Sequence, residues 1–534
     1  MKKGLLGVSL FTLTCLYCVL FAVVFLIGLF VGAEMSKLIL IAIIILVVQY
    51  LIAPFFTDLS MKWFYKARFD CQPPEYLVNF INSVCAQNNM KYPKIGYIDD
   101  GAPNAFTYGR TKNDARIVLT RGIFDLLTPE EVKAVVAHEI GHAVHYDMAV
   151  MTMAQLIPLV LYYCYEIFTK NVDDKDDAKL AIIGYIAYIL YLISDYIILW
   201  LSRQREYYAD SFSIEATRNP SALAEALVKI GFGLSTNAPA SGGKSVSKGN
   251  ALGIFDTNAS KSLSVVSYGN GGISKNNIMH AMKWEMWNVW AKWYELHSTH
   301  PNVSKRLKAI SERCPEFGQP KYIDFNYQQP ESYWDDFFGE LFILCLPWIT
   351  IVGMLVLMIF LVELGKDIDA LTCCCAIVAG LSVAHLIKLS FTHKDKNYKE
   401  TKVSELLGEV KVSGVTAIPC QLSGVIIGRG DPGCIFSEDL VLQDETGIMF
   451  LDYKRVFRIM DKLTALFNNK KFMNKRVKIT GWYRRSPVPY VEIKQIEYEG
   501  DGTVDKMKSF AVNKFITWFF LIGSVAMIVL NIIG

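Results

Sequence analysis

A glutamate between two histidines offers the clearest chemistry in this sequence. Residues 138–142 read H-E-I-G-H, which places His138 and His142 four positions apart with Glu139 beside the first. Residues four apart share one helix face, so both imidazoles can bind one cation. Glu139 lies about 100° round the helix, where it can reach a metal-bound water without binding the metal. This pattern is typical of a zinc hydrolase.

Chance explains this pattern poorly. With eight histidines in 534 residues, only about 0.006 matches to H-E-x-x-H are expected in the chain. The surrounding residues also suit a catalytic helix. An extended segment at 116–120 precedes the sequence T-P-E-E at 128–131, which is a capping box with proline at the first helical position. A helix that begins at Pro129 and carries both histidines is therefore expected.

A second segment offers further metal ligands. Residues 202–210 read SRQREYYAD, which places Glu206 and Asp210 four positions apart on one helix face. One carboxylate can bind the metal while the other orients a histidine ligand through its second nitrogen. The spacing does not decide which carboxylate does which. The alternative is an acidic pair that forms surface ion pairs with Arg203 and Arg205.

Composition predicts that these elements belong to an integral membrane protein. Hydrophobic residues make up 52% of the chain and charged residues 20%, below the share of about 25% in soluble proteins. The net charge of +3 is too small to indicate a nucleic-acid partner. Seven of the twelve cysteines lie in apolar runs and the others show no C-x-x-C spacing, so neither a zinc ribbon nor a disulfide framework is indicated. Seven spans are predicted, at about residues 5–32, 37–56, 149–168, 180–201, 341–363, 368–390 and 511–533.

The distribution of lysine and arginine predicts the orientation. Basic residues flank the spans on one side, whereas the opposite side holds only the short loops 32–37, 171–179 and 363–369. By the positive-inside rule, the large soluble segments lie in the cytoplasm. The first span is predicted to be a retained anchor, because its apolar stretch is longer than that of a signal peptide. No organelle-targeting signal precedes it, which favours a prokaryotic plasma membrane.

Two regions of the soluble segments stand out. Residues 233–277 are rich in glycine, serine and asparagine and predict a loop. After them, tryptophan recurs every three residues on a predicted helix, at Trp284, Trp287, Trp290 and Trp293. An aromatic face that packs against the core or lies at the bilayer interface is the first interpretation. A wall that grips apolar substrate side chains is the second.

Residues 391–509 predict a small β-barrel of the OB type. A helix is expected at Arg455–Phe467, and strands are expected at Glu405–Ser413, Ile418–Ile427, Asp439–Gln443, Gly447–Asp452, Lys475–Trp482 and Tyr490–Tyr498. Basic and aromatic residues near Trp482 could suit single-stranded nucleic acid. Anionic lipid headgroups beside the domain explain the basic residues better. The domain is therefore expected to dock substrates or partner membrane proteins and to bind no nucleic acid.

Four motifs together resemble the M48 family of membrane zinc metallopeptidases, most closely the HtpX-type proteases. In the family's order they are N-A-F at 104–106 followed by Tyr108-Gly109, H-E-x-x-H at 138–142, S-R-x-R-E-x-x-A-D at 202–210, and S-T-H-P at 298–301 with Arg306 beyond. The resemblance covers about residues 1–311. It implies one Zn²⁺ per chain, held by His138, His142 and Glu206.

The resemblance also implies roles for the neighbouring residues. Glu139 would be the general base, and Asp210 would support a histidine ligand. Asn104, Ala105 and Phe106 would hold the substrate backbone by taking it up as an extra strand. His300 would lie near the metal as a candidate donor to the developing oxyanion, with a structural His-Pro turn as the alternative.

The expected function is that of a zinc endopeptidase which cuts misfolded or surplus membrane proteins, or cytoplasmic ones, in protein quality control. One alternative is a prenyl-protein (CAAX) endopeptidase of the same family. That branch places more spans before its H-E-x-x-H, whereas only two precede His138 here. Another alternative is a non-catalytic membrane scaffold or assembly factor. The presence of Glu139 argues against it, because a binding protein needs no general base.

The expected fold is a multi-span α-helical membrane protein. It combines a mainly α, zincin-type metallopeptidase domain, which has a small edge sheet, with a C-terminal OB-like β-barrel. The expected parts are two transmembrane helices at 1–56, the peptidase domain at 57–338 with its own spans at 149–168 and 180–201, a transmembrane hairpin at 339–390, the OB-like domain at 391–509, and a last transmembrane helix at 510–534.

Overall fold

The computed structural model of this chain contains two compact units. One unit comprises Met1–Lys261 and Trp293–Phe325, and the other comprises Ser262–Lys292 and Asn326–Gly534. The residues that the structure describes are 35–169, 175–236, 262, 268–269, 272–325, 327–365, 369–429, 440–452, 474–499, 504–506 and 509–533. The histidine motif lies in the first unit, and the predicted barrel lies in the second.

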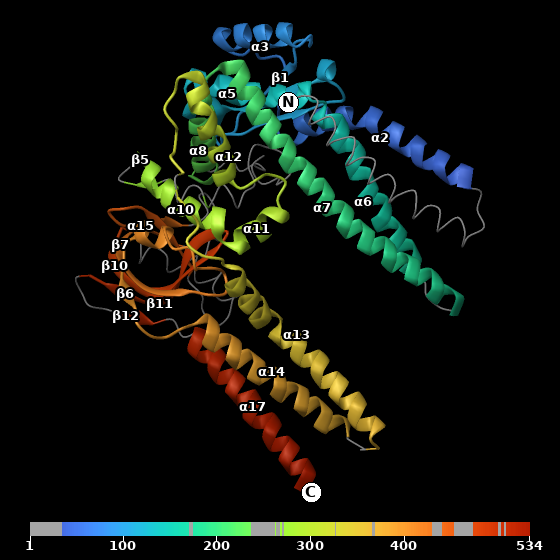
Figure 1. The fold of residues 1–534 in the computed structure, drawn as a ribbon, viewed down its shortest axis with the longest axis vertical. Helices are drawn as coiled ribbons and strands as arrows, with labels where there is room; N and C mark the ends of the chain where they lie inside the picture. The colour runs from blue at the N-terminus through green and yellow to red at the C-terminus, as the bar shows by residue number, and fades with distance from the viewer. Residues whose placement is uncertain are drawn as a thin grey trace. The chain divides into compact units, whose positions relative to one another are not determined.

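The first unit is mainly helical, with one small sheet (Figure 1). Its helices are α2 (Met35–Phe64), α3 (Glu75–Gln87), α4 (Arg121–Leu126), α5 (Pro129–Val144), α6 (Asp147–Thr169), α7 (Lys175–Thr217), α8 (Pro220–Thr236) and α12 (Val303–Arg313). Its strands are β1 (Lys94–Ile98), β2 (Ala105–Tyr108) and β3 (Arg116–Thr120), in the order β1-β3-β2.

Strand β2 lies at an edge of this sheet. It pairs antiparallel with β3, and among the described residues it has no strand on its other side. All five residues of β3 are buried, so β3 forms the centre of the sheet. Helix α5 lies against β2, and the Thr107 hydroxyl oxygen of β2 is 3.1 Å from the carbonyl oxygen of Glu139. The edge strand therefore runs beside the helix that carries the histidines.

Helix α5 begins as its sequence predicts. Thr128 and Glu131 form the capping box, and Pro129 occupies the first turn. The helix is buried on most of its surface, because α7 and α8 pack against it in addition to the sheet. The buried Glu131 carboxylate accepts from Lys229 of α8 at 2.6 Å, which compensates for the removal of its charge from water.

Helices α6 and α7 form a long hairpin (Figure 1). Their contact is a core of small and branched residues that includes Ala154, Ile157, Leu161, Ala187 and Ile198. Helix α7 is continuous over 43 residues, about twice the length that crosses a bilayer. The predicted span at 180–201 and the two acidic residues Glu206 and Asp210 therefore lie on one uninterrupted helix. The helix fixes the position of both carboxylates relative to the span.

Five helices in the described part of the chain are long and apolar enough to cross a membrane. They are Asp147–Thr169, Ala181–Thr217, Trp334–Glu363, Ala370–Thr392 and Phe510–Asn531, and they coincide with the last five predicted spans. The first predicted span, 5–32, lies outside the described residues. The second, 37–56, falls within α2, most of whose earlier side chains are not described. The count of seven spans stays a prediction.

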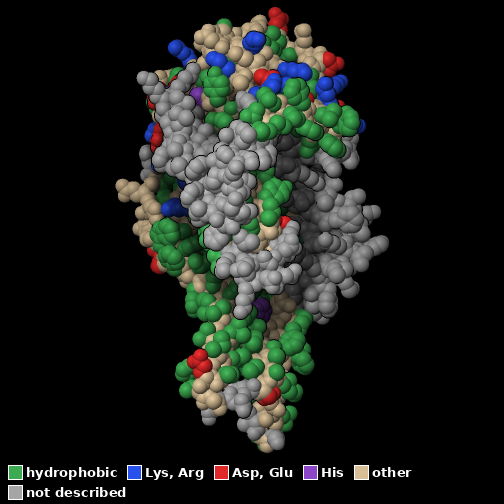
Figure 2. Space-filling view, turned by 90° about the vertical axis from the view of Figure 1, so that its right-hand side faces the viewer, with side chains coloured by type: hydrophobic (Ala, Val, Ile, Leu, Met, Phe, Trp, Pro, Cys, Tyr) green, Lys and Arg blue, Asp and Glu red, His purple; other side chains and the backbone are tan. Residues whose placement is uncertain are grey.

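The second unit joins a β-barrel to three apolar helices. Its helices are α10 (Lys275–Trp287), α13 (Trp334–Glu363), α14 (Ala370–Thr392), α15 (Val403–Leu407) and α17 (Ser509–Ile533), and α11 (Val289–Leu296) begins in it. Helix α14 packs against both α13 and α17. Hydrophobic side chains cover most of the visible surface at the far ends of these three helices, in the lower part of Figure 2. Such a surface is suited to lipid rather than water.

Five strands close the barrel. They are β7 (Ile418–Arg429), β8 (Leu440–Gln443), β9 (Ile448–Asp452), β10 (Arg476–Ser486) and β11 (Val488–Tyr498). The order is β10-β11-β9-β8-β7, and a further pairing of β10 with β7 completes the ring. The β9–β11 pairing is parallel, whereas the others in the ring are antiparallel. The short strands β6 (Lys399–Glu400) and β12 (Val504–Lys506) add to its edges, and β4 (Tyr268–Gly269) pairs with β5 (Gly272–Ile273) elsewhere in the unit.

One predicted strand is wrong. Residues 405–413 were expected to form the first strand, but residues 403–407 form the short helix α15. Its buried residues are Val403, Leu406 and Leu407, a spacing of three and four that suits a helix and not the alternation of a strand. The predicted helix Arg455–Phe467 lies outside the described residues, as does most of the predicted loop 233–277.

The tryptophan series serves mainly to pack the second unit. Trp284 is 1% exposed, and its indole nitrogen donates to the carbonyl oxygen of Val412 at 2.7 Å. The Arg485 guanidinium lies 4.5 Å from the centre of the same ring. Trp287 and Trp290 are also buried. The packing interpretation is therefore confirmed for these three tryptophans, whereas Trp293, in the first unit, is 42% exposed.

Candidate active site

Three potential metal ligands meet between α5 and α7. One nitrogen or oxygen atom from each of His138, His142 and Glu206 lies within 4.8 Å of the other two. The two histidine Nε2 atoms are 3.2 Å apart, and each lies 3.6 Å from one oxygen of Glu206. Two imidazole nitrogens so close together need a proton or a cation between their lone pairs. Two nitrogens and one carboxylate are a donor set that suits zinc.

Asp210 occupies a different position from Glu206. One of its oxygens lies 3.0 Å from Nδ1 of His138, on the side of the ring away from the cluster. Its carboxylate also accepts two hydrogen bonds from Arg306, at 2.7 and 2.9 Å. Asp210 is therefore placed to orient the His138 ring, while Glu206 lies among the Nε2 atoms. The arrangement favours Glu206 as the third ligand and Asp210 as the support of His138, a choice that the sequence spacing left open.

A carboxylate also contacts Nδ1 of His142, as Asp210 contacts Nδ1 of His138, and the sequence analysis did not identify it. The Nδ1 atom of His142 lies 2.7 Å from Asp147, and Arg205 holds the same carboxylate at 2.6 Å. Asp147 is the first residue of α6. An acidic residue at the start of the next helix, five positions after His142, is the signal that could have revealed it.

These carboxylates affect the protonation of His142. Burial by itself lowers the pKa of its imidazole, but the hydrogen bond to Asp147 and the charges of Asp147, Glu206 and Glu139 raise that pKa to about 9. The metal-free imidazole therefore holds a proton at neutral pH. A metal ion that binds His142 must displace this proton, so binding of the metal releases it.

The charges around the cluster are unbalanced without a cation. Four buried carboxylates gather here, those of Glu139, Asp147, Glu206 and Asp210. They face two buried guanidinium groups, Arg205 and Arg306. Burial lowers the pKa of Arg306, but the charges of Asp210 and Glu206 more than offset this effect and raise the pKa, so Arg306 stays protonated. With both imidazoles neutral, as metal binding requires, these groups leave two negative charges, which a divalent cation would neutralise. In the metal-free site the protonated His142 offsets one of them. The residues therefore fit a zinc ion.

Glu139 is held by the edge strand. Its carboxylate is buried and accepts a hydrogen bond from the Thr107 hydroxyl at 2.7 Å. Thr107 belongs to β2, so the strand at the edge of the small sheet contacts the candidate base. Sequence analysis did not identify Thr107, because a threonine in a short strand carries no signal of its own.

The residues expected to hold substrate form the beginning of β2. The Asn104 side chain is buried and accepts from the backbone N–H of Ala105 at 2.9 Å, which shapes the entry to the strand. Ala105 and Phe106 are also buried, at 0% and 4% exposed for the whole residue with its backbone. Their role in holding a substrate strand stays a prediction.

His300 lies close to the cluster. Its Nδ1 is 3.8 Å from an oxygen of Glu206. Its backbone N–H donates to the Ser298 hydroxyl at 3.1 Å. Arg203 donates to the carbonyl oxygens of Glu295 and Ser298, at 2.8 and 2.9 Å, and so fastens the same loop to α7. His300 therefore belongs to a structural turn and also lies near the cluster, because the loop that contains it is held against α7.

Comparison with known proteins gives consistent matches for the first unit. Residues 72–314 match the model of peptidase family M48. A protease HtpX homolog from Methanothermobacter thermautotrophicus is 40% identical over 191 residues, which cover 36% of this chain and 71% of that protein. A protease HtpX homolog 2 from Methanosarcina acetivorans is 30% identical over 330 residues, with 59% of this chain and 96% of that protein covered.

A solved structure also matches, but weakly. The crystal structure of S. mikatae Ste24p aligns with a TM-score of 0.32 and 18% identity, covering 58% of this chain and 67% of that chain. A similarity at this level carries no structural argument. The barrel and the three apolar helices of the second unit lie beyond residue 314, where the family match ends.

Proposed function

Because this chain belongs to peptidase family M48 and is an HtpX-like protease, we propose that it is a zinc-dependent membrane endopeptidase with His138, His142 and Glu206 as the metal ligands. The observation that carries the proposal is the cluster of these three side chains in a buried site, where two negative charges stay uncompensated when both imidazoles are neutral. A zinc ion held there supplies Lewis acidity, which activates a water molecule and polarises the scissile carbonyl.

The protein's own residues perform the proton transfers. Glu139 accepts a proton from the attacking water and then gives it to the leaving amine. The hydrogen bond from Thr107 keeps the Glu139 carboxylate in one orientation. Asp210 and Asp147 hold the two imidazoles through Nδ1. No covalent intermediate is needed.

Strand β2, which has no strand on its other side among the described residues, is the proposed substrate site. We propose that the backbone of an unfolded segment adds to β2 along Asn104–Phe106, so that its scissile bond lies between Glu139 and His300. His300 would then donate to the developing oxyanion. A site that binds backbone suits many sequences, which supports misfolded membrane or cytoplasmic proteins as substrates. The contact between Thr107 and Glu139 favours an enzyme over a scaffold.

Removal of the metal tests the proposed function. Purified protein in detergent should contain about one zinc ion per chain, measured by elemental analysis, and should cleave casein. Treatment with 1,10-phenanthroline should abolish cleavage, and stoichiometric Zn²⁺ should restore it. Magnesium, which prefers oxygen ligands in octahedral geometry, should not restore it. Full activity of protein without metal would contradict the proposal.

We further propose that the peptidase domain and the barrel both face the cytoplasm of a prokaryotic cell, with seven spans in the plasma membrane. We also propose that the barrel is OB-like and docks substrates or membrane-protein partners. The closed order of its five strands supports the OB-like assignment.

Cysteine labelling tests the orientation. In a variant in which serine replaces the exposed Cys71 and Cys374, Asp174→Cys should react with a membrane-impermeant maleimide added to intact cells. Ser404→Cys, in the barrel region, should react only after the membrane is permeabilised. The opposite pattern would place the soluble regions outside the cell.

A further inference from the structure

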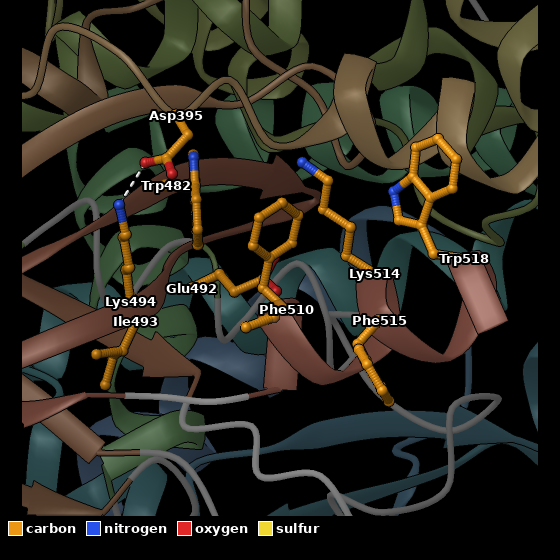
Figure 3. A pocket seen from close by; sticks show the side chains of 10 residues that line it. Asp395, Trp482, Glu492, Ile493, Lys494, Phe510, Lys514, Phe515 and Trp518 are labelled. Atoms are coloured by element: carbon orange, nitrogen blue, oxygen red, sulfur yellow. Dashed lines mark hydrogen bonds and ion pairs between the residues drawn. The ribbon is translucent and has the colours of Figure 1, made fainter.

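A cavity of about 430 Å³ lies in the second unit between strand β11 and the first turns of helix α17 (Figure 3). Four aromatic side chains line it: Trp482, Phe510, Phe515 and Trp518. Trp482 is buried in the barrel, and its ring centre is 5.6 Å from that of Phe510. The barrel wall and the start of the helix therefore enclose the cavity together.

The charged groups of the cavity leave one cation available. Lys494 forms an ion pair with Asp395, and the Glu492 carboxylate accepts from Arg484 at 2.9 Å. Lys514 is exposed and has no ion pair within 4 Å in the described part of the chain. Its charge adds to the larger effect of the Lys494 hydrogen bond in lowering the pKa of Asp395. Figure 3 shows it extending from α17 on the same side as Phe510 and Trp518. Because the other charges neutralise one another, the cavity favours an anionic ligand.

The cavity lies at one end of a candidate membrane span. Helix α17 contains the span Phe510–Asn531, and Lys514 is in its second turn. Phe515 is 71% exposed and Trp518 is 47% exposed, and the apolar residues that follow are also exposed. Tryptophan and lysine near the end of a span lie at the level of the lipid headgroups. The cavity is therefore placed at the boundary between water and hydrocarbon.

We propose that this cavity binds the headgroup of an anionic membrane phospholipid. The lipid phosphate contacts the Lys514 ammonium group, and the glycerol and the upper acyl chains lie against Phe515 and Trp518. A bound lipid would bridge the barrel and α17, which both contribute to the cavity wall. The proposal is independent of the peptidase mechanism, because the cavity shares no residue with the metal cluster.

Native mass spectrometry of the full chain in detergent can test this proposal. Dioleoyl phosphatidylglycerol is the anionic probe, and dioleoyl phosphatidylcholine is the zwitterionic one. The first tightly held phosphatidylglycerol should bind about fivefold more strongly than phosphatidylcholine, the contribution of one lysine at an anionic membrane surface. Lys514→Gln should remove this preference. Trp518→Ala should weaken the binding of both lipids, because it removes the apolar wall.

A matched control comes from the same unit. Lys399 is exposed on β6 and does not line the cavity, so Lys399→Gln should keep the lipid preference. Equal effects of the two lysine substitutions would show general attraction to lipid and would overturn the proposal. Displacement of the lipid by millimolar glycerol 3-phosphate would also overturn it, because the cavity would then be a site for a soluble phosphate ester.

Discussion

Glu139→Gln is expected to slow the cleavage of an unfolded membrane substrate by about 10²–10⁴-fold while the zinc content stays unchanged. Glutamine keeps the size of the side chain and an oxygen that can accept the Thr107 hydrogen bond, which is 2.7 Å long in the structure. It cannot take a proton from water. Because Glu139 is not a proposed ligand, the metal and the fold should persist. Turnover and zinc content measured on the same preparation check both parts.

A matched control lies on the same helix. The Glu130 side chain is 56% exposed and pairs with Lys133 in the first turn of α5, so Glu130→Gln should leave turnover and zinc content unchanged. Undiminished turnover in Glu139→Gln would refute the assignment of the general base. A normal cellular phenotype together with abolished cleavage would support the scaffold function instead.

Glu206→Ala is expected to remove zinc and activity together. The substitution deletes one of the three proposed ligands. It also removes a negative charge that lies 3.2 Å from the buried Arg306 guanidinium, so the positive charge of Arg306 is less well neutralised near the metal. Asp210→Asn should have a smaller effect on zinc, because Asp210 acts on the metal through His138, although the change also weakens the buried pairing with Arg306. Loss of such an outer partner costs about 10–100-fold in metal affinity. Competition with a fluorescent zinc chelator measures both affinities.

The control for this series is Glu215→Ala. Glu215 lies farther along α7, with its side chain 54% exposed and 3.7 Å from Arg313, so zinc affinity should not change. If zinc survives Glu206→Ala but is lost in Asp210→Asn, the third ligand is Asp210. In that case the proposed cluster is wrong.

Local sequence patterns predict the parts of the site that one helix contains. The capping box and Pro129 set the start of α5, and a spacing of four residues brings His138 and His142 together. The barrel strands were found in the same way, from short apolar runs between turn residues. Where the local pattern was ambiguous, the prediction failed. Residues 405–413 were read as a strand although Val403, Leu406 and Leu407 follow a helical period.

Contacts that depend on how elements pack could not be predicted in this way. Asp147 lies only five positions after His142, but its contact with His142 depends on the sharp turn at Tyr146 between α5 and α6, whose φ is +60°. Thr107 reaches Glu139 because the sheet packs on α5, 32 residues away in the chain, and a threonine in a short strand carries no signal of its own. The cavity at α17 likewise depends on the barrel and the helix meeting.

The sequence alone indicated the chemistry that we propose for this protein, from a motif typical of zinc binding with a glutamate beside it, placed among apolar segments. It could do so because residue type and helical period are local properties. Only the tertiary structure decided which carboxylate joins the histidines. Glu206 and Asp210 share one face of α7 and differ by one helical turn, so their spacing suits both roles. The packing of α7 on α5, and the pairing of Arg306 with Asp210, place Glu206 at Nε2 and Asp210 at Nδ1.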